Sequence, residues 1–160
     1  MTKIPKRKVV VAVSGGFDPI HIGHIELFQA AKKLGDELVV ILNNDNWLKQ
    51  KKQHIFMDQS ERRAILEALK PVDRVVLTKH RPDTKDISVC QALKDLKPDI
   101  FANGGDRNKK NIPEVPTCQT IGCQMIFNVG LNGKRQSSSW LLANYAKKVL
   151  NLKSSDRNKT

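Results

Sequence analysis

The chain has 160 residues, a usual size for a single domain, and its 39% hydrophobic content is ordinary for a globular protein, which argues against wholesale disorder. Its longest apolar run is far shorter than the ~18 residues that a membrane span needs, and no signal peptide is evident, so we expect a cytoplasmic protein without a membrane partner. The net charge is +12, but residues 1–8 and 147–160 carry two thirds of it, which disfavours nucleic acid as a partner.

The first part of the chain alternates strand and helix signals. The β-branched run 9–13 predicts a strand that is buried on both faces. A turn cluster at 14–19 leads into helical spacing of apolar residues over 20–34. A second buried strand is predicted at 38–42, followed by a lysine-rich loop at 49–52.

The alternation continues to the end of the chain. Capping boxes open two helices, one from Asp58 to Leu69 and one from Ser88 to Leu96. The remaining elements are strands at 72–77, 100–102 and 124–129, a weak helical turn at 113–116, and a helix from Ser137 to about Leu150.

This order of elements predicts an α/β fold, a Rossmann-like doubly wound open parallel five-stranded sheet with helices on both faces. Ligands of such sheets bind beyond the carboxyl ends of the strands, so the loops after the first, second and fourth strands are the ones to search. We expect one domain over 9–150 between basic tails at 1–8 and 151–160. Its cysteines are expected to be reduced thiols, at Cys90, Cys118 and Cys123.

The segment between the first strand and the first helix carries the strongest chemical signal. His21 and His24 lie three residues apart at a helix start, with Gly23 between them. A helix N-terminus suits phosphates, and two imidazoles beside it can stabilise charge on a phosphorus centre. A zinc site is the alternative, with Asp18 as a third ligand, although Asp18 is expected rather to hold the turn.

Three further clusters have residue types that suit phosphates or a nucleoside. Lysines in the loop 49–52 provide point charges, and Gly104 with Gly105 allows a ring to approach the backbone. Serines at 137–139 combine hydroxyls with helix-start amides. Each cluster also has a simpler interpretation: a solvated charge run, a surface turn and an N-cap.

The motif His21-Ile22-Gly23-His24 resembles the H-x-G-H signature of the nucleotidylyltransferase superfamily. Segments in the family's order follow it, so the similarity extends from about Val9 to Leu150; they lie at 34–36, 43–45, 49–52, 60–63, 71–76, 98–101 and 104–106. The combination is similar to the glycerol-3-phosphate cytidylyltransferases and to the adenylyltransferase domains of ADP-heptose synthases.

The resemblance implies an enzyme in which a phosphomonoester attacks the α-phosphorus of a nucleoside triphosphate and pyrophosphate leaves. It implies catalytic roles for His21, His24, Lys51 and Ser138. It implies nucleotide contacts from Gly15, Gly16, Phe17, Asn103, Gly104, Gly105, Asp106, Ser137 and Ser139. It implies acceptor contacts from Lys49, Arg62, Lys85 and Arg135, with an exposed helix position as the alternative for Arg62. Mg²⁺ bound through the triphosphate, no protein metal ligand, and a homodimer are implied in the same way.

The sequence departs from the family pattern at a few positions. Gly16 stands where many members have Thr or Ser, and Leu142 lies where a basic residue is common. Asn132 replaces an arginine of one branch, so Lys134 or Arg135 is expected to substitute. The lysine loop favours CTP, whereas the segment 104–106 favours ATP. We predict CTP with glycerol 3-phosphate or a sugar phosphate as acceptor; the alternatives are an ATP-dependent adenylyltransferase with a heptose-1-phosphate-like acceptor and a non-catalytic nucleotide-binding regulator.

Overall fold

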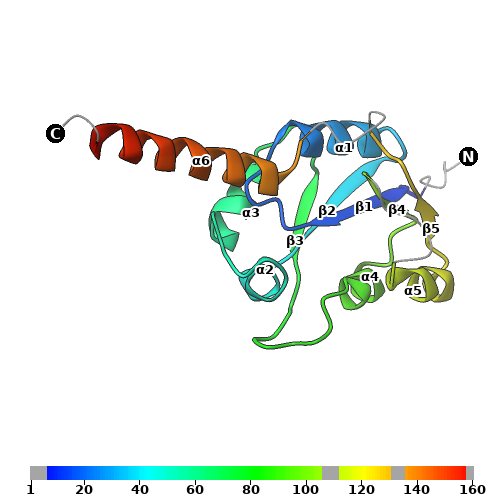
Figure 1. The fold of residues 1–160 in the computed structure, drawn as a ribbon. Helices are drawn as coiled ribbons and strands as arrows, with labels where there is room; N and C mark the ends of the chain where they lie inside the picture. The colour runs from blue at the N-terminus through cyan, green and yellow to red at the C-terminus, as the bar shows by residue number, and fades with distance from the viewer. Residues whose placement is uncertain (1–6, 106–111, 131–135, 158–160) are drawn as a thin grey trace, which may run out of the picture.

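The computed structural model describes residues 7–105, 112–130 and 136–157, with the side chains beyond residue 151 left out. Over these residues the strands form one parallel sheet in the order β3-β2-β1-β4-β5. The strands are β1 (Val10–Gly15), β2 (Glu37–Leu42), β3 (Arg74–Leu77), β4 (Ile100–Ala102) and β5 (Gln124–Ile126). The predicted Rossmann-like doubly wound sheet is confirmed (Figure 1).

Helices cover both faces of the sheet because the central strands are apolar on both sides. Val11 and Val13 of β1 belong to the core beneath α1 (Ile22–Lys32) and α3 (Gln59–Glu67). Ala12 faces the second core, beneath α4 (Cys90–Leu96) and α5 (Glu114–Ile121). The two remaining helices are α2 (Asp45–Lys52) and α6 (Ser138–Arg157).

The strand order reverses at β1, whose neighbours are β2 on one side and β4 on the other. Such a switch point leaves a crevice at the carboxyl ends of the strands, where open α/β sheets bind their ligands. The loops that follow β1, β2 and β4 therefore meet at one edge of the sheet.

Several predicted elements differ from the observed ones, and the strand predicted at 124–129 is shorter, ending at Ile126 as β5. The segment 49–52 is not a loop, because Asn44 caps the amide of Trp47 and so starts α2, which runs through the lysines. The capping box at Ser88 does not form: α4 begins at Cys90 without a side-chain cap, and Gln91 donates to Asp95 instead. The turn at 113–116 extends into the eight-residue helix α5.

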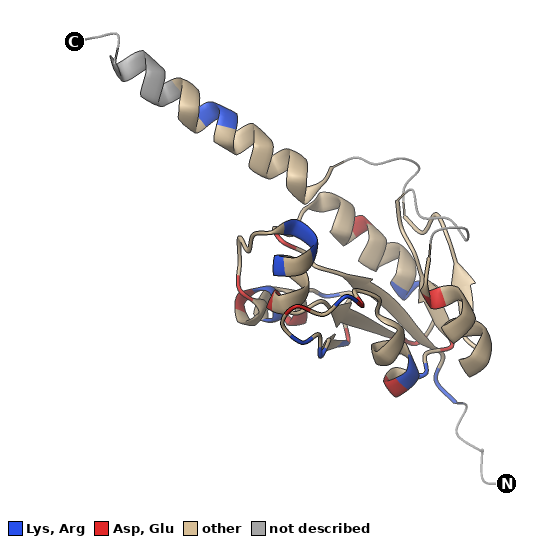
Figure 2. Cartoon of the chain, turned by 60° about the horizontal axis from the view of Figure 1, so that its bottom comes forward, with Lys and Arg blue, Asp and Glu red and all other residues tan. Residues whose placement is uncertain are grey.

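The last helix is longer than expected. Residues 151–157, predicted as tail, continue α6 as far as Arg157, and α6 extends well away from the sheet (Figures 1 and 2). Across the body of the chain, basic and acidic residues are interspersed (Figure 2). None of the described helices has the length and apolar character that a membrane crossing requires. The cysteines are free, one half-buried and two buried.

Candidate active site

A cavity of about 440 Å³ opens at the carboxyl ends of β1 and β4. Its walls come from the loop after β1, the first turn of α1, the helix α2, the loop after β4 and the N-terminus of α6. The predicted site residues that line it are Gly15, Gly16, Phe17, His21, His24, Asn103, Gly104, Gly105, Ser137, Ser138 and Ser139. The structure therefore brings the histidine motif, the glycine loop and the serine cluster to one place.

The two histidines form the start of α1. His21 is the N-cap, and its Nδ1 accepts the amide of Gly23 at 3.2 Å. His24, three residues on, accepts the amide of His21 at its own Nδ1, at 3.3 Å. The pair is a capping box made from imidazoles. The spacing of three thus reflects cap geometry, which the sequence interpretation, with both rings on one helix face, did not foresee.

This capping fixes the tautomer of both rings. A ring nitrogen that accepts a backbone N–H carries no proton, so in the neutral imidazoles the proton is on Nε2. The rings stack with centroids 3.7 Å apart and planes inclined by 25°. Both rings line the cavity, so their Nε2–H groups can together stabilise a developing oxyanion.

Burial keeps His24 neutral. Its pKa is lowered from 6.5 to about 3, first by burial and then by the charges of His21 and Lys52. The rings of His24 and Phe17 also pack in a T-shaped contact, with their centroids 4.9 Å apart. His24 therefore acts as a hydrogen-bond donor at neutral pH rather than as a cation.

We expect this buried histidine to make the fold acid-sensitive. Because the folded pKa of His24 lies below the unfolded value of 6.5, the unfolded state binds more protons between those two values, and stability falls as pH drops. Replacing His24 by asparagine keeps an acceptor for the cap and removes the titration. Between pH 7 and 5, urea unfolding should show the parent chain losing about 2 kcal/mol more than the variant. If the two chains lost the same free energy of unfolding between pH 7 and 5, the result would contradict a neutral buried ring.

The loop after β1 is shaped by close packing. Phe17 has a positive φ of 51°, and its ring lies over Gly15, where a Cβ would come within 2.8 Å of the ring. Phe17 is almost fully buried and also packs on Phe28. Phe17 therefore both borders the cavity and packs against the ring of His24.

Gly16 faces α2 rather than open space. A Cβ at Gly16 would lie 2.9 Å from Leu48 Cδ2 and 3.2 Å from Trp47 Cζ3. The side chains of α2 thus fill the volume that a threonine or serine would need. This packing explains why the chain departs from the family pattern at Gly16.

A buried aspartate and a buried arginine tie this loop to the rest of the site. Asp18 accepts the amides of Phe56 and Met57, each at 2.7 Å, which confirms that it holds the turn. Arg62, 1% exposed, donates to the carbonyls of Gly16 and Asn43, each at 2.7 Å. Arg62 is therefore not an exposed helix residue; it does not line the cavity, and its guanidinium links the loops after β1 and β2.

The lysines of α2 divide into two groups. Lys49 and Lys51 are exposed, and neither lines the cavity. Lys52 is half-buried and does line it, beside Gly16 and Trp47. The structure thus does not bring the two predicted lysines to the site, and it adds one that the sequence interpretation gave no role.

The opposite side of the cavity contains the other predicted nucleotide contacts. Asn103 is buried at the end of β4, and its backbone N–H donates to the carbonyl of Ile126. Gly104 packs tightly, since a Cβ there would lie 3.1 Å from the carbonyl of Val129. Gly105 follows at the exposed rim with a φ of +70°.

The serines have separate tasks at the start of α6. Ser137 caps the helix by accepting the amide of Trp140 at 3.1 Å. Ser138 is buried and donates to the carbonyl of Pro19 at 2.8 Å, which ties α6 to the loop after β1. Ser139 is exposed at the cavity. First-turn amides lack acceptors within the helix, so this N-terminus can bind phosphate.

Besides Lys49, Lys51 and Arg62, three more predicted residues are not part of the described cavity. Lys85 is exposed in the loop between β3 and α4 and does not line it. Asp106 and Arg135 lie outside the described residues. In contrast, Glu26, Trp47, Gln136 and Trp140 line the cavity without having been predicted. Gln136 and Trp140 flank the predicted serine cluster and Glu26 follows the histidine motif, so position beside a motif is the signal that could have found them; Trp47 is brought to the cavity by α2.

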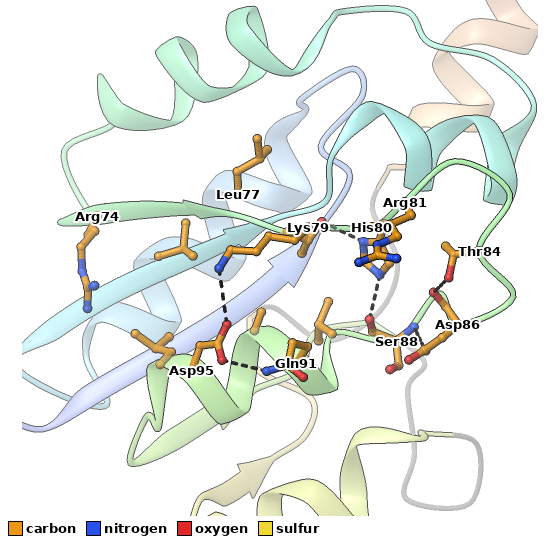
Figure 3. A pocket seen from close by; sticks show the side chains of 15 residues that line it. Arg74, Leu77, Lys79, His80, Arg81, Thr84, Asp86, Ser88, Gln91 and Asp95 are labelled. Atoms are coloured by element: carbon orange, nitrogen blue, oxygen red, sulfur yellow. Dashed lines mark hydrogen bonds and ion pairs between the residues drawn. The ribbon is translucent and has the colours of Figure 1, made fainter.

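A second cavity, of about 430 Å³, lies beside β3 and α4 (Figure 3). Its histidine is engaged at both ring nitrogens: His80 Nδ1 lies 2.8 Å from Thr78 Oγ1, and Nε2 lies 2.9 Å from the carbonyl of Ser88. Lys79 points towards Asp95, at 3.9 Å (Figure 3). None of the predicted site residues lines this cavity, so the chemistry is assigned to the first one.

The donor groups at the first cavity do not suit zinc. Asp18 uses both carboxylate oxygens on backbone amides, and both histidines use Nδ1 in the cap. Within the part of the chain that the structure describes, no three His, Cys, Asp or Glu side chains are placed to hold a metal ion.

Comparisons with known proteins agree with this geometry. A family model described as cytidylyltransferase-like matches residues 12–144. An FAD synthase from Thermococcus sibiricus is 41% identical over 109 residues, covering 68% of this chain and 69% of that protein. An FAD synthase from Pyrococcus horikoshii is 41% identical over 103 residues, covering 64% and 66%. The chain thus spans about two thirds of the length of these archaeal relatives.

Two further matches cover more of this chain. The bifunctional protein HldE of Streptomyces coelicolor is 36% identical over 139 residues, which are 86% of this chain and 28% of that protein. A crystal structure of the lipopolysaccharide core biosynthesis protein from Thermoplasma volcanium superposes with a TM-score of 0.64 at 28% identity, covering 79% of this chain and all of that one.

Proposed function

The chain belongs to the cytidylyltransferase-like family of nucleotidyltransferases, and on that premise we propose that it transfers the adenylyl group of ATP to a phosphomonoester. An oxygen of the acceptor phosphate forms a bond to the α-phosphorus. The bond from that phosphorus to the bridging oxygen breaks, and pyrophosphate leaves with the electron pair. The acceptor is already ionised near pH 7, so the reaction needs no strong base and no covalent enzyme intermediate.

The observation that carries this proposal is the stacked histidine pair that lines the cavity, with the Nδ1 atom of each ring accepting a backbone amide. Two hydrogen-bond donors at one point can stabilise the charge that develops on the α-phosphate oxygens. The N-terminus of α6, with Ser139 at the cavity, is placed to receive the leaving pyrophosphate. The remaining contribution to catalysis is positioning of the two substrates.

Two observations favour ATP over the predicted CTP. The relatives that match at about 40% identity are FAD synthases, and FAD contains an adenylyl group. The prediction of CTP depended on the lysine-rich segment 49–52 as a loop, but this segment is helical and only Lys52 of its three lysines lines the cavity. FAD formation from ATP requires flavin mononucleotide as acceptor. That molecule is a phosphomonoester, as is a sugar phosphate, so both acceptors fit the reaction.

Mg²⁺ is proposed as the companion of the triphosphate. The histidine Nε2–H groups and the occupied carboxylate of Asp18 give no oxygen cage for a hard cation. This donor set suits an ion held through phosphate oxygens and water, which neutralises charge on the triphosphate when it is bound. A homodimer is retained only as a proposal that the family implies.

We expect pyrophosphate release with ATP to exceed release with CTP by at least about tenfold, because a site that pairs with one base discriminates by hydrogen bonds to it. The assay crosses ATP, CTP, GTP and UTP with flavin mononucleotide, glycerol 3-phosphate and sugar 1-phosphates in the presence of Mg²⁺. Preferred turnover of CTP would overturn the assignment of ATP. Binding of ATP without turnover of any acceptor would favour the non-catalytic regulator, and failure to bind any triphosphate would contradict the proposed function.

A further inference from the structure

One carboxylate stands among the described residues that line the first cavity, and it belongs to Glu26. Glu26 is half-buried in the second turn of α1, three residues after Gly23. Residues three apart share a face of a helix, and Gly23 also lines the cavity. The helix α1 therefore presents Glu26 on the face that borders the cavity.

The charge of Glu26 is the opposite of what a phosphate needs. The histidine pair, the half-buried Lys52 and the N-terminus of α6 all suit anionic oxygens. An ionised carboxylate repels those oxygens and can only accept hydrogen bonds. Glu26 is therefore suited to a neutral part of a substrate that carries N–H or O–H donors. In ATP such donors occur only in the nucleoside, as the 6-amino group and the two ribose hydroxyls.

The packing of Leu27, the next residue, shows where Glu26 lies within the cavity. A Cβ at Gly104 would lie 3.1 Å from Leu27 Cδ1, and one at Gly130 would lie 3.8 Å from the Leu27 backbone. These glycines follow β4 and β5, which are on the opposite side of β1 from the strand that leads into α2. The described lining residues of these two loops carry no charge. This part of the cavity therefore suits a nucleoside better than a phosphate.

We propose that Glu26 recognises the nucleoside of ATP by accepting a hydrogen bond from it. The donor is a ribose hydroxyl or the 6-amino group, since both offer a carboxylate the same chemistry. A hydrogen bond to a charged acceptor is stronger than one between neutral groups, so a nucleoside that lacks the donor is bound more weakly. This inference rests on the proposed function and names a residue that selects its first substrate.

The test measures dissociation constants without an acceptor, with Mg²⁺ and again with EDTA, so that it needs no turnover. The probes are ATP and analogues that each lack one donor: 2′-deoxy-ATP, 3′-deoxy-ATP and purine riboside triphosphate. The parent chain should bind one of these analogues about 10- to 100-fold more weakly than ATP. In Glu26→Ala that preference should fall to within about twofold, because ATP then loses the same bond. The analogue that shows this behaviour identifies the donor.

Two further variants serve as controls. Glu61→Ala removes an exposed carboxylate that does not line the cavity, so its preferences should equal those of the parent chain. Glu26→Gln keeps an acceptor oxygen without the charge and should lose at least about threefold of the preference, so it decides the question if Glu26→Ala does not fold. Urea unfolding checks the fold of each variant. Unchanged preferences in a folded Glu26 variant would overturn the proposal.

Inorganic triphosphate separates recognition of the nucleoside from a role on the phosphates. It offers no donor to a carboxylate, so Glu26→Ala should bind it at least as tightly as the parent chain does, while ATP is bound more weakly. If Glu26→Ala weakened the binding of both ligands, and only with Mg²⁺, Glu26 would be a metal ligand and the proposal would be wrong. Failure of the parent chain to bind ATP would contradict the proposed function, and this inference would fall with it.

Discussion

Replacing His21 by asparagine should lower kcat by about 10²- to 10³-fold, the usual effect of removing one donor from an oxyanion-stabilising pair. Asparagine places an oxygen near the position of Nδ1, so it can still accept the amide of Gly23 and cap α1. It has no group at the position of Nε2. The variant should therefore keep its free energy of unfolding within about 1 kcal/mol of the parent value while losing turnover. Steady-state kinetics and urea unfolding measure the two quantities.

The converse substitution is the control. Glutamine at His21 extends an amide donor towards the position of Nε2 but does not reach the cap well. His21→Gln should retain more activity than His21→Asn and be the less stable of the two. If both variants were inactive and equally stable, the donor at Nε2 would not be the feature that matters, and the imidazole itself would be required.

The parts of the fold that were predicted well depend on short-range patterns. The continuous aliphatic runs at β1 and β2 predicted buried strands because parallel strands are covered on both faces. Half of the capping box predicted at Asp58 is present: Asp58 accepts the amides of Ser60 and Glu61 and starts α3, while the described hydrogen bonds include no return bond to the Glu61 side chain. Both signals involve residues within one element, so the sequence contains all of the information they need.

The site residues were predicted less completely because their directions depend on tertiary contacts. Roles were predicted for Lys49 and Lys51 but not for Lys52, since composition alone does not show that Asn44 starts a helix there. Trp47 donates to the carbonyl of Ile87, 40 residues away, and this contact helps to orient α2. In that orientation Lys52 lines the cavity, whereas Lys49 and Lys51 do not.

The role of Arg62 illustrates the same limit. Its position early in a helix suggested either an exposed residue or a substrate contact. In the structure its guanidinium instead donates to the carbonyls of two loop residues, Gly16 directly after β1 and Asn43 directly after β2. These partners lie 46 and 19 residues away in the chain, so no local pattern indicates them.

Replacing Arg62 by methionine should destabilise the fold by about 3–5 kcal/mol, the range found when one partner of a buried charged network is removed. The substitution leaves the carbonyls of Gly16, Asn43 and Met57 without their donor and leaves Asp45 without its cation. Such a loss is a large fraction of the 5–15 kcal/mol that typically stabilises a domain. Urea unfolding of the variant measures it directly.

The adjacent residue provides a matched control, because Arg63 is exposed and pairs only with Glu67 one turn along the helix. Arg63→Met also removes one positive charge from α3 and introduces the same side chain. It should nevertheless lower the free energy of unfolding by less than about 0.5 kcal/mol. Arg62→Lys keeps the charge but cannot reproduce the fork of donors, so its stability should fall between those of Arg62→Met and the parent chain. Equal stabilities for Arg62→Met and Arg63→Met would show that the buried network does not hold the loop after β1, and the geometry of Gly16 would then need another cause.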